Sequence, residues 1–171
     1  MSDNEQHAQF ERLVSPYLDA AYNLARWLAG NDHDAEDIAQ EACVRAFRFI
    51  GGCRAGDGRA WLLTIVRNTA YSWLKKNRPP AVVALDDDEF AEIADRNVGA
   101  GSFHGADRDT LRAALEVLPL EFREALVLRE LEGLSYKEIA EVAEVPVGTV
   151  MSRLARARQQ LQDALHRKGI V

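Results

Sequence analysis

Cysteine is scarce in this chain, and the two cysteines that occur are poorly placed for metal binding. Cys43 and Cys53 lie ten positions apart in 171 residues, and no CxxC arrangement is present. A structural zinc site needs about four ligands at close spacing, which four scattered histidines do not supply. The sequence therefore predicts no metal site and no other cofactor, and we interpret both thiols as reduced.

Long hydrophobic runs are also missing. No apolar stretch approaches the roughly 18 residues of a membrane-spanning helix. The N-terminal stretch MSDNEQHAQFER is polar and acidic, unlike a signal peptide. We therefore expect no membrane insertion, and the expected compartment is the cytoplasm. With 47% hydrophobic and 28% charged residues, the chain should form a packed core.

An excess of positive charge, which many nucleic-acid-binding proteins show, is absent too: the formal net charge is −6. The distribution of charge matters more than its sum. Residues 59–78 carry five basic side chains and no acidic one, and residues 151–168 carry five basic side chains and one aspartate. Residues 86–95 carry six acidic side chains and no basic one. The chain therefore has two basic segments separated by an acidic segment.

Apolar residues recur at helical spacing through most of the chain, which predicts an all-α fold. Pro16 interrupts the first helix, Gly30 ends it, and Pro79-Pro80 ends the third. A glycine-rich loop is expected over 50–58. The predicted helices span residues 10–28, 34–49, 59–77, 108–117, 120–131, 135–143 and 147–166.

The acidic segment divides the chain into two parts. Residues 81–107 are acidic at first and contain three glycines near their end, which is typical of an interdomain linker. A short helical turn around 90–93 is compatible with the pattern. We therefore expect two small helical domains, over residues 1–80 and 108–171, joined by a flexible acidic linker.

The stretch LSYKEIAEVAEVPVGTVMSRLARAR, from Leu134 to Arg158, has the pattern of two helices with a tight turn between them. Ser135 and Glu138 have the spacing of a capping box, and Pro146 stands where the second helix would begin. The apolar face of that helix would contain Val147, Val150, Leu154, Ala157, Leu161 and Leu165. The opposite face would contain Gly148, Ser152, Ala155, Arg156 and Gln159, with Arg153 and Arg158 on its flanks.

A helix that enters a DNA major groove needs this arrangement. Its apolar back packs on its own domain, while small residues allow close approach and polar ones reach base edges and phosphates. The stretch is therefore interpreted as a DNA-binding helix-turn-helix. The alternative is an ordinary amphipathic hairpin with a solvated basic face.

The helix expected over 59–77 carries basic residues, an aromatic and an amide on one face. Its core side would contain Leu62, Ile65, Val66, Thr69 and Trp73. Its opposite side would include Arg67, Asn68, Tyr71 and Lys75. The basic side chains can hold phosphates, while an aromatic ring can stack on an unpaired base. The alternative is a solvated basic face, and Trp61, at the junction of loop and helix, is compatible with a core position.

The helix expected over 34–49 has an acidic outer face. Its buried side would contain Ala35, Ile38, Ala42, Ala46 and Phe49. Its outer side would contain Asp37, Gln40, Glu41, Val44 and Arg48. This side is either solvated surface or a docking face for a basic partner helix, with Val44 supplying an apolar contact.

Three stretches in this order resemble one family over nearly the whole chain. They are DAEDIAQEACVRAFR, RAWLLTIVRNTAYSWLKKNRPP and LPLEFREALVLRELEGLSYKEIAEVAEVPVGTVMSRLARARQQL. They resemble regions 2.2, 2.3 to 2.4, and 4 of the sigma-70 family of bacterial RNA polymerase initiation factors, in its extracytoplasmic-function (ECF) group. The resemblance implies core RNA polymerase and promoter DNA as partners, an anti-sigma factor as regulator, and no small-molecule substrate.

The resemblance also implies roles for individual residues. The face that grips the clamp helices of the polymerase's largest subunit matches Asp37, Gln40, Glu41 and Val44. The positions next to −10 promoter DNA match Trp61, Arg67, Asn68, Tyr71 and Lys75, and the loop over 51–58 would capture a flipped base. The positions that read the −35 element as duplex match Thr149, Ser152, Arg153 and Arg156. The linker would thread the active-site and RNA-exit channels of the polymerase.

The chain departs from the family pattern at three places. Glu144 stands in the helix-turn-helix turn, where relatives often have glycine, so a non-glycine residue must adopt that backbone. Met151 stands where many relatives carry a basic residue, which removes one phosphate contact. GDG replaces the usual aromatic before RAW, which changes the expected shape of the flipped-base pocket.

Two other classes of function compete with the initiation factor. A conventional helix-turn-helix regulator with an N-terminal helical sensing domain would bind a palindrome by itself as a dimer. The second basic-aromatic helix, over 59–78, argues against that alternative because such a regulator does not need it. No carboxylate pair, metal cluster or nucleophile–base arrangement at usable spacing suggests an enzyme.

Overall fold

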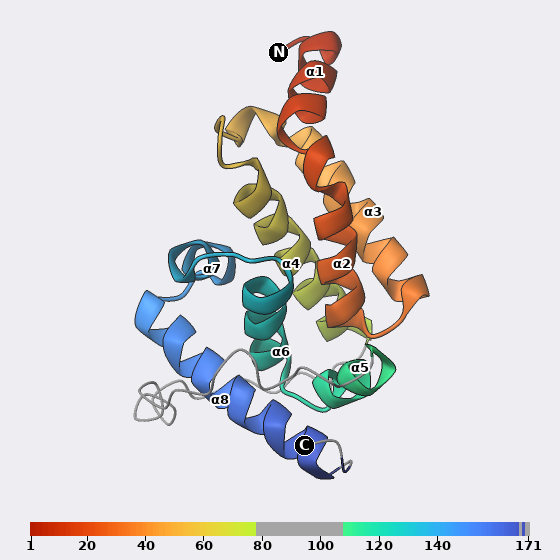
Figure 1. The fold of residues 1–171 in the computed structure, drawn as a ribbon. Coiled ribbons are helices and arrows are strands. Elements are labelled where there is room, and N and C mark those ends of the chain that lie inside the picture. The colour runs from red at the N-terminus through yellow and green to blue at the C-terminus, as the bar shows by residue number, and fades with distance from the viewer. Residues whose placement is uncertain (78–107, 168, 170–171) are drawn as a thin grey trace. The chain divides into compact units, whose positions relative to one another are not determined.

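The computed structural model describes residues 1–77, 108–167 and 169, and within these residues the regular elements are helices (Figure 1). The described residues form two compact units, one built from helices α1 to α4 and the other from α5 to α8. The all-α prediction is therefore confirmed. The predicted linker over 81–107, with its possible turn around 90–93, lies outside the described residues. Within the described part, no helix combines the length and hydropathy needed to cross a membrane.

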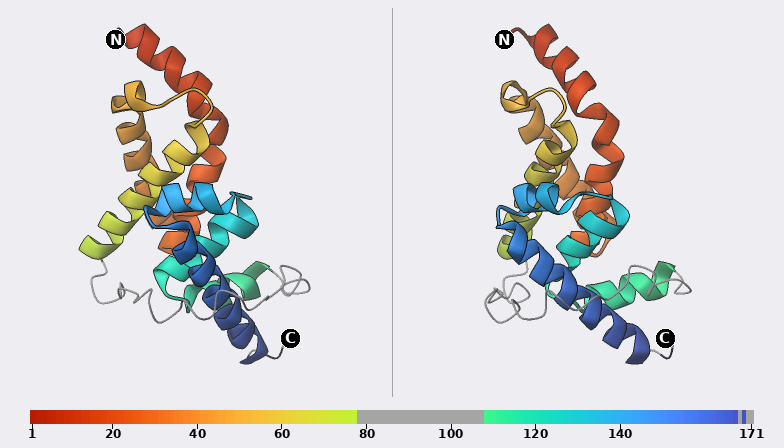
Figure 2. Two further views of the ribbon diagram at one scale, coloured as in Figure 1. Left: turned by 90° about the vertical axis from the view of Figure 1, so that its left-hand side faces the viewer. Right: turned by 60° about the vertical axis from the view of Figure 1, so that its left-hand side comes forward.

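In the first unit, α2, α3 and α4 pack side by side. Helix α1 precedes α2 and extends away from its N-terminal end (Figures 1 and 2). Two short 3-10 turns connect these helices, over Ser15–Tyr17 and Ile50–Gly52. The helices span Asp3–Leu13 (α1), Leu18–Ala29 (α2), Asp32–Arg48 (α3) and Gly58–Asn77 (α4).

Local signals account for most of these boundaries. The side chain of Asn31 accepts a hydrogen bond from the backbone N–H of Asp34 at 2.8 Å and caps α3. Ser2 caps α1 in the same way through Glu5, so this helix begins seven residues before the predicted start at residue 10. Pro16 falls in the 3-10 turn that separates α1 from α2, as its position predicted. Gly30 ends α2 with a φ of 88°, in the left-handed region that glycine tolerates.

The core of the first unit differs from the predicted core at α4 and at the end of α3. Leu63, Ala70 and Leu74 are buried in addition to the expected residues, because both α2 and α3 pack on α4 and cover a wide arc of it. Ile65 and Trp73, which were also predicted to lie in the core, are only partly buried. Phe49 is 61% exposed rather than buried. It follows the last residue of α3 with φ −106° and ψ 20°, so it no longer follows the helical periodicity on which the prediction rested.

In the second unit, the long helix α8 packs on α5 and α6 (Figure 1). After α6 the chain continues as a π-helical turn over Val127–Leu131, in which Glu132 N–H donates to the Val127 carbonyl at 3.0 Å. The helices span Arg108–Glu116 (α5), Leu120–Leu126 (α6), Tyr136–Ala143 (α7) and Val147–Arg167 (α8).

Arg123 of α6 holds the turn between α5 and α6. Its guanidinium donates to three carbonyl oxygens near the end of α5, those of Leu115 at 2.9 Å, Glu116 at 3.0 Å and Leu118 at 3.2 Å. The Leu115 carbonyl also accepts from Leu118 N–H at 3.1 Å. Carbonyls in the last turn of a helix lack the usual intrahelical partner, so a charged donor at this end satisfies them and also opposes the helix dipole.

We therefore expect Arg123→Ala to destabilise the second unit by about 2 kcal/mol, because three charge-assisted hydrogen bonds are lost at a partly buried position. Denaturant unfolding of the full chain measures this change. The matched control is Lys137→Ala, which removes an exposed cation from α7 and should change stability by less than about 0.5 kcal/mol. Equal stability of the two variants would contradict the capping role.

Candidate nucleic-acid interface

The helix-turn-helix of α7 and α8 forms as its sequence predicts. The Ser135 hydroxyl accepts from Glu138 N–H at 3.1 Å, and the Glu138 carboxylate accepts from Ser135 N–H at 3.0 Å. This reciprocal pair is the predicted capping box. Glu144 occupies the turn with φ 58° and ψ 46°, so a non-glycine residue does adopt the left-handed backbone. These local features set where α8 begins relative to α7.

Two arginines fasten this motif to the rest of its unit. Arg129 donates to the Leu134 carbonyl at 2.8 Å, and its guanidinium carbon lies 4.8 Å from the centroid of the Tyr136 ring. Arg158 of α8 pairs with Glu130 at 2.8 Å, and both side chains are largely buried. The sequence pattern predicted that Arg158 lies on the flank of the DNA face. In the structure its guanidinium instead forms the ion pair with Glu130 of the same unit.

The side chains predicted to read the −35 element are unevenly exposed. Arg156 and Thr149 are partly exposed, whereas Ser152 and Arg153 are 5% and 8% exposed. The Ser152 hydroxyl donates to the carbonyl of Gly148, one turn earlier in α8, at 3.0 Å. Ala155 is also buried, so α8 is covered over more of its circumference than its apolar stripe predicts.

The apolar back of α8 is buried as predicted, apart from its first residue. Val150, Leu154, Ala157, Leu161 and Leu165 are each at most 2% exposed. Val147 was predicted to lie on this buried face, but it is 41% exposed. The prediction for Val147 is therefore wrong. Val147 is the first residue of α8, and helical periodicity does not determine whether a residue at a helix end is covered.

On α4 the predicted −10 residues lie together on a partly exposed face. Trp61, Arg67, Asn68 and Tyr71 are half-buried, and Lys75 is exposed. The Arg67 guanidinium carbon lies 3.9 Å from the centroid of the Tyr71 ring, and Arg67 donates to Asn68 Oδ1 at 3.2 Å. A cation stacked on an aromatic ring beside an amide presents a flat, charged surface, which suits an unpaired base and its phosphate.

On α3 the predicted docking side chains form what we call the acidic face, consisting of Asp37, Gln40, Glu41 and Val44. All four are exposed, and Val44 is 56% exposed. The side chains point away from the buried stripe of α3, as their helical spacing predicted. A charged and apolar strip of this kind offers ion pairs and one hydrophobic contact to a basic helix.

Arg45 connects the acidic face to α4, and sequence patterns did not single it out. It pairs with Glu41 at 2.8 Å and donates to the hydroxyl of the buried Thr69 at 3.4 Å. The spacing of Glu41 and Arg45 predicts a helical ion pair. Nothing in the local pattern predicts the contact with Thr69, because it joins residues 24 positions apart.

The surroundings of both thiols favour the protonated form. Burial raises the pKa of the Cys43 thiol, and burial together with the nearby Asp57 carboxylate raises the pKa of Cys53. Cys53 also donates a long hydrogen bond to the Arg54 carbonyl, at 3.6 Å. A raised pKa keeps a thiol protonated near neutral pH and lowers its nucleophilicity. Both cysteines are free in the structure.

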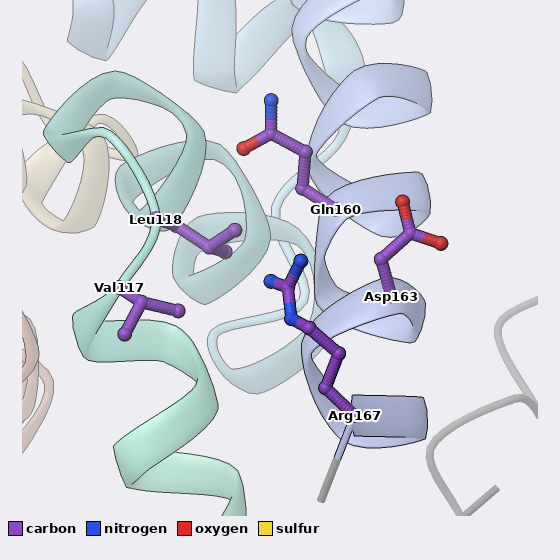
Figure 3. Close-up of a pocket in the computed structure, with 5 residues that line it drawn as sticks. All are labelled: Val117, Leu118, Gln160, Asp163 and Arg167. Atoms are coloured by element: carbon purple, nitrogen blue, oxygen red, sulfur yellow. The ribbon is translucent and has the colours of Figure 1, made fainter.

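A shallow pocket of about 260 Å³ lies between the end of α5 and the last turns of α8 (Figure 3). It is lined by Val117, Leu118, Gln160, Asp163 and Arg167. This lining holds one carboxylate and one guanidinium but no nucleophile. In the part of the chain that the structure describes, no group of three or more histidine, cysteine or acidic residues is arranged to hold a metal ion.

Family models match both units. The model for sigma-70 region 2 matches residues 13–79, and the model for sigma-70, region 4 matches residues 108–161. Together these matches cover more than half of the chain. The first includes the acidic face and the α4 residues, and the second includes the helix-turn-helix.

Individual relatives agree with the family models. The chain is 38% identical to the RNA polymerase sigma-H factor of Pseudomonas aeruginosa, over 91% of this chain and 86% of that protein. It is 39% identical to the ECF RNA polymerase sigma factor SigE of Mycolicibacterium smegmatis, over 95% of this chain but only 64% of that longer protein.

A solved structure also resembles this one. It is the sigma factor RpoE of Bartonella quintana in complex with the anti-sigma factor NepR, with a TM-score of 0.72 and 27% sequence identity. The match covers 92% of this chain and 96% of that chain. From the matched regions, the relatives and the fold, we conclude that the chain belongs to the sigma-70 family of RNA polymerase sigma factors, in its ECF group.

Proposed function

We propose that this chain is a transcription initiation factor that binds core RNA polymerase and directs it to promoters. The observation that carries the proposal is the combination of an acidic docking face, a cation–aromatic face on α4 and a helix-turn-helix in one family member. Catalysis belongs to the polymerase, and the chain acts in the cytoplasm, where its DNA template is. The net charge of −6 disfavours DNA binding by the chain alone, so promoter recognition requires the polymerase.

The proposed roles divide between residues 1–80 and 108–171. The acidic face of α3 binds the polymerase. Trp61, Arg67, Asn68, Tyr71 and Lys75 of α4 hold the −10 element once its strands separate. A surface that captures an unpaired base stabilises the melted state, because the captured base cannot re-stack in the duplex.

The second unit reads the −35 element as duplex through Thr149, Ser152, Arg153 and Arg156. Arg156 is partly exposed, which supports its proposed contact with a base edge or a phosphate. Burial of Ser152 and Arg153 means that these two contribute directly only if their surroundings rearrange on binding. An anti-sigma factor controls the chain, and the complex of the Bartonella quintana relative with NepR supports this regulation.

The proposal is tested by a gel-shift with a promoter library, with and without core RNA polymerase. We expect a defined site to be bound only when the polymerase is present, with protection of two separate boxes. Tight binding of one palindrome by the chain alone would instead support a conventional helix-turn-helix regulator.

Arg156→Ala is expected to weaken −35 recognition about ten-fold or more, because a cation at a base edge or phosphate is lost. Binding to core polymerase should not change, since Arg156 lies far in sequence from the acidic face. Affinity of the polymerase complex for duplex carrying the −35 box measures the effect. Arg167→Ala is the matched control, since it removes the same charge about 16 Å further along the same helix. Equal losses in both variants would indicate a general charge effect.

A further inference from the structure

Two apolar side chains at the start of α8 face solvent, although the other apolar residues of this helix are buried. Val147 is 41% exposed and Met151 is 40% exposed. They are four residues apart, so they lie one above the other on the same side of the helix. A Cβ atom added to Gly148 would meet no atom within 4 Å, so the surface beside Val147 is open. We call Val147 and Met151 the α8 apolar pair.

Ser152, a polar residue that follows Met151, is hydrogen-bonded within the helix. The Ser152 hydroxyl donates its hydrogen to the Gly148 carbonyl at 3.0 Å, so that hydrogen is not offered to a base acceptor. Arg156 follows Ser152 by one turn and is partly exposed. The side of α8 that bears the pair therefore presents an apolar surface, whereas Thr149 and Arg156, both partly exposed, lie about 140–180° around the helix from it.

We propose that the α8 apolar pair reads thymine in the −35 duplex through the C5-methyl group. The inference rests on the proposed function, because it assumes that α8 enters the major groove of promoter DNA. Thymine alone among the four bases presents an apolar group in that groove. The N-terminal residues of a recognition helix are the ones that contact base edges, and the pair lies in those turns.

The open surface at Gly148 and the position of Arg156 favour DNA over a protein as the occupant. Absence of a side chain at Gly148 lets the helix approach the bases closely. Gly148 lies between the pair and Arg156 around the helix, so the Arg156 cation is on the other flank of an entering helix and suits the phosphates that border the groove. Met151, which removes a phosphate contact expected of a basic residue, supplies a methyl contact in its place.

The test replaces thymine by uracil, which removes only the C5-methyl group. The full chain is assembled with core RNA polymerase, and a −35 box is selected from a promoter library. Each thymine of the box, on either strand, is then changed singly to uracil. We expect about four-fold weaker binding at one or two positions, the effect of losing one buried methyl group. Uracil substitution between the two boxes is the control and should have no effect.

Protein variants assign the methyl effect to the pair. In Met151→Ala or Val147→Ala, the ratio of affinities for thymine and uracil at the sensitive position should fall to nearly one. In Met151→Leu, which keeps an apolar side chain of similar size, the ratio should persist. Because both side chains are exposed, the variants should fold, and thermal unfolding checks this.

Several results would overturn the inference. These are a selected −35 box without thymine, equal affinity for thymine and uracil at every position, and a ratio that both alanine variants leave unchanged. Loss of polymerase binding by Met151→Ala without any uracil effect would assign the pair to a protein contact. Failure of the polymerase complex to form, or to select any −35 box, would instead refute the proposed function, so the two failures are distinguishable.

Discussion

Asp37→Lys should abolish binding to core RNA polymerase, with affinity falling at least about 100-fold. Asp37 lies at the centre of the acidic face of α3, and its side chain is 51% exposed. The variant places a cation where the proposed partner helix is basic, and like charges in contact cost several kcal/mol. The Asp37 carboxylate is 3.9 Å from His33 Nε2, which is too long for a hydrogen bond, so the fold should not depend on it.

The matched control is Glu36→Lys. Glu36 is the neighbouring exposed acidic residue of α3, about 100° around the helix from Asp37 and at the edge of the acidic face, on the side toward Tyr22. It undergoes the same change of charge, so any long-range electrostatic effect is shared. Titration of labelled chain with core polymerase measures both affinities. If Asp37→Lys binds as well as Glu36→Lys, the assignment of the acidic face is wrong.

Gly58→Ala is expected to destabilise the first unit by about 3 kcal/mol or more. Gly58 is the first residue of α4 and is buried against the end of α1. An added Cβ would overlap the carbonyl oxygen of Leu13 and would lie 3.4 Å from the Tyr17 ring. Because the overlap is with backbone, the α1 segment or the start of α4 must shift, and overpacking of this kind is costly. The melting temperature of that unit should fall by more than about 10 °C.

Gly52→Ala provides the comparison for this prediction. Gly52 belongs to the preceding 3-10 turn, has no positive φ, and has nothing within 4 Å of its added Cβ. Its substitution should change stability by less than about 1 kcal/mol. Calorimetry of the three full-length proteins would contradict the packing argument if Gly58→Ala melted within about 2 °C of the unsubstituted chain.

The helices and their ends were largely predictable because the interactions that define them are local. The capping box of Ser135 and Glu138 joins residues three apart, and the Asn31 cap does the same. The break at Pro16 depends on one ring that restricts its own backbone. The left-handed backbone at Glu144 was expected from the resemblance to the family's helix-turn-helix, in whose turn relatives often have glycine.

Exposure was less predictable, because helical periodicity ranks faces but does not say what covers them. Phe49 and Val147 both continue an apolar stripe in sequence, yet each lies at a helix end where packing partners are absent, and each is exposed. Ser152 shows the opposite deviation, since it was expected on the open face and is buried. The candidate DNA surface of α8 is thus more apolar than its sequence pattern predicts.

The amino-acid sequence by itself therefore determines the set of helices, their caps, the two basic segments and the family. Tertiary structure decides which distant groups meet: Gly58 against Leu13, Arg45 against Thr69, and Arg123 against the end of α5. The physical reason is range. A cap or a helical turn is satisfied within about four residues, whereas a buried contact exists only once separate helices have packed, and that packing also settles which side chains remain available to a partner.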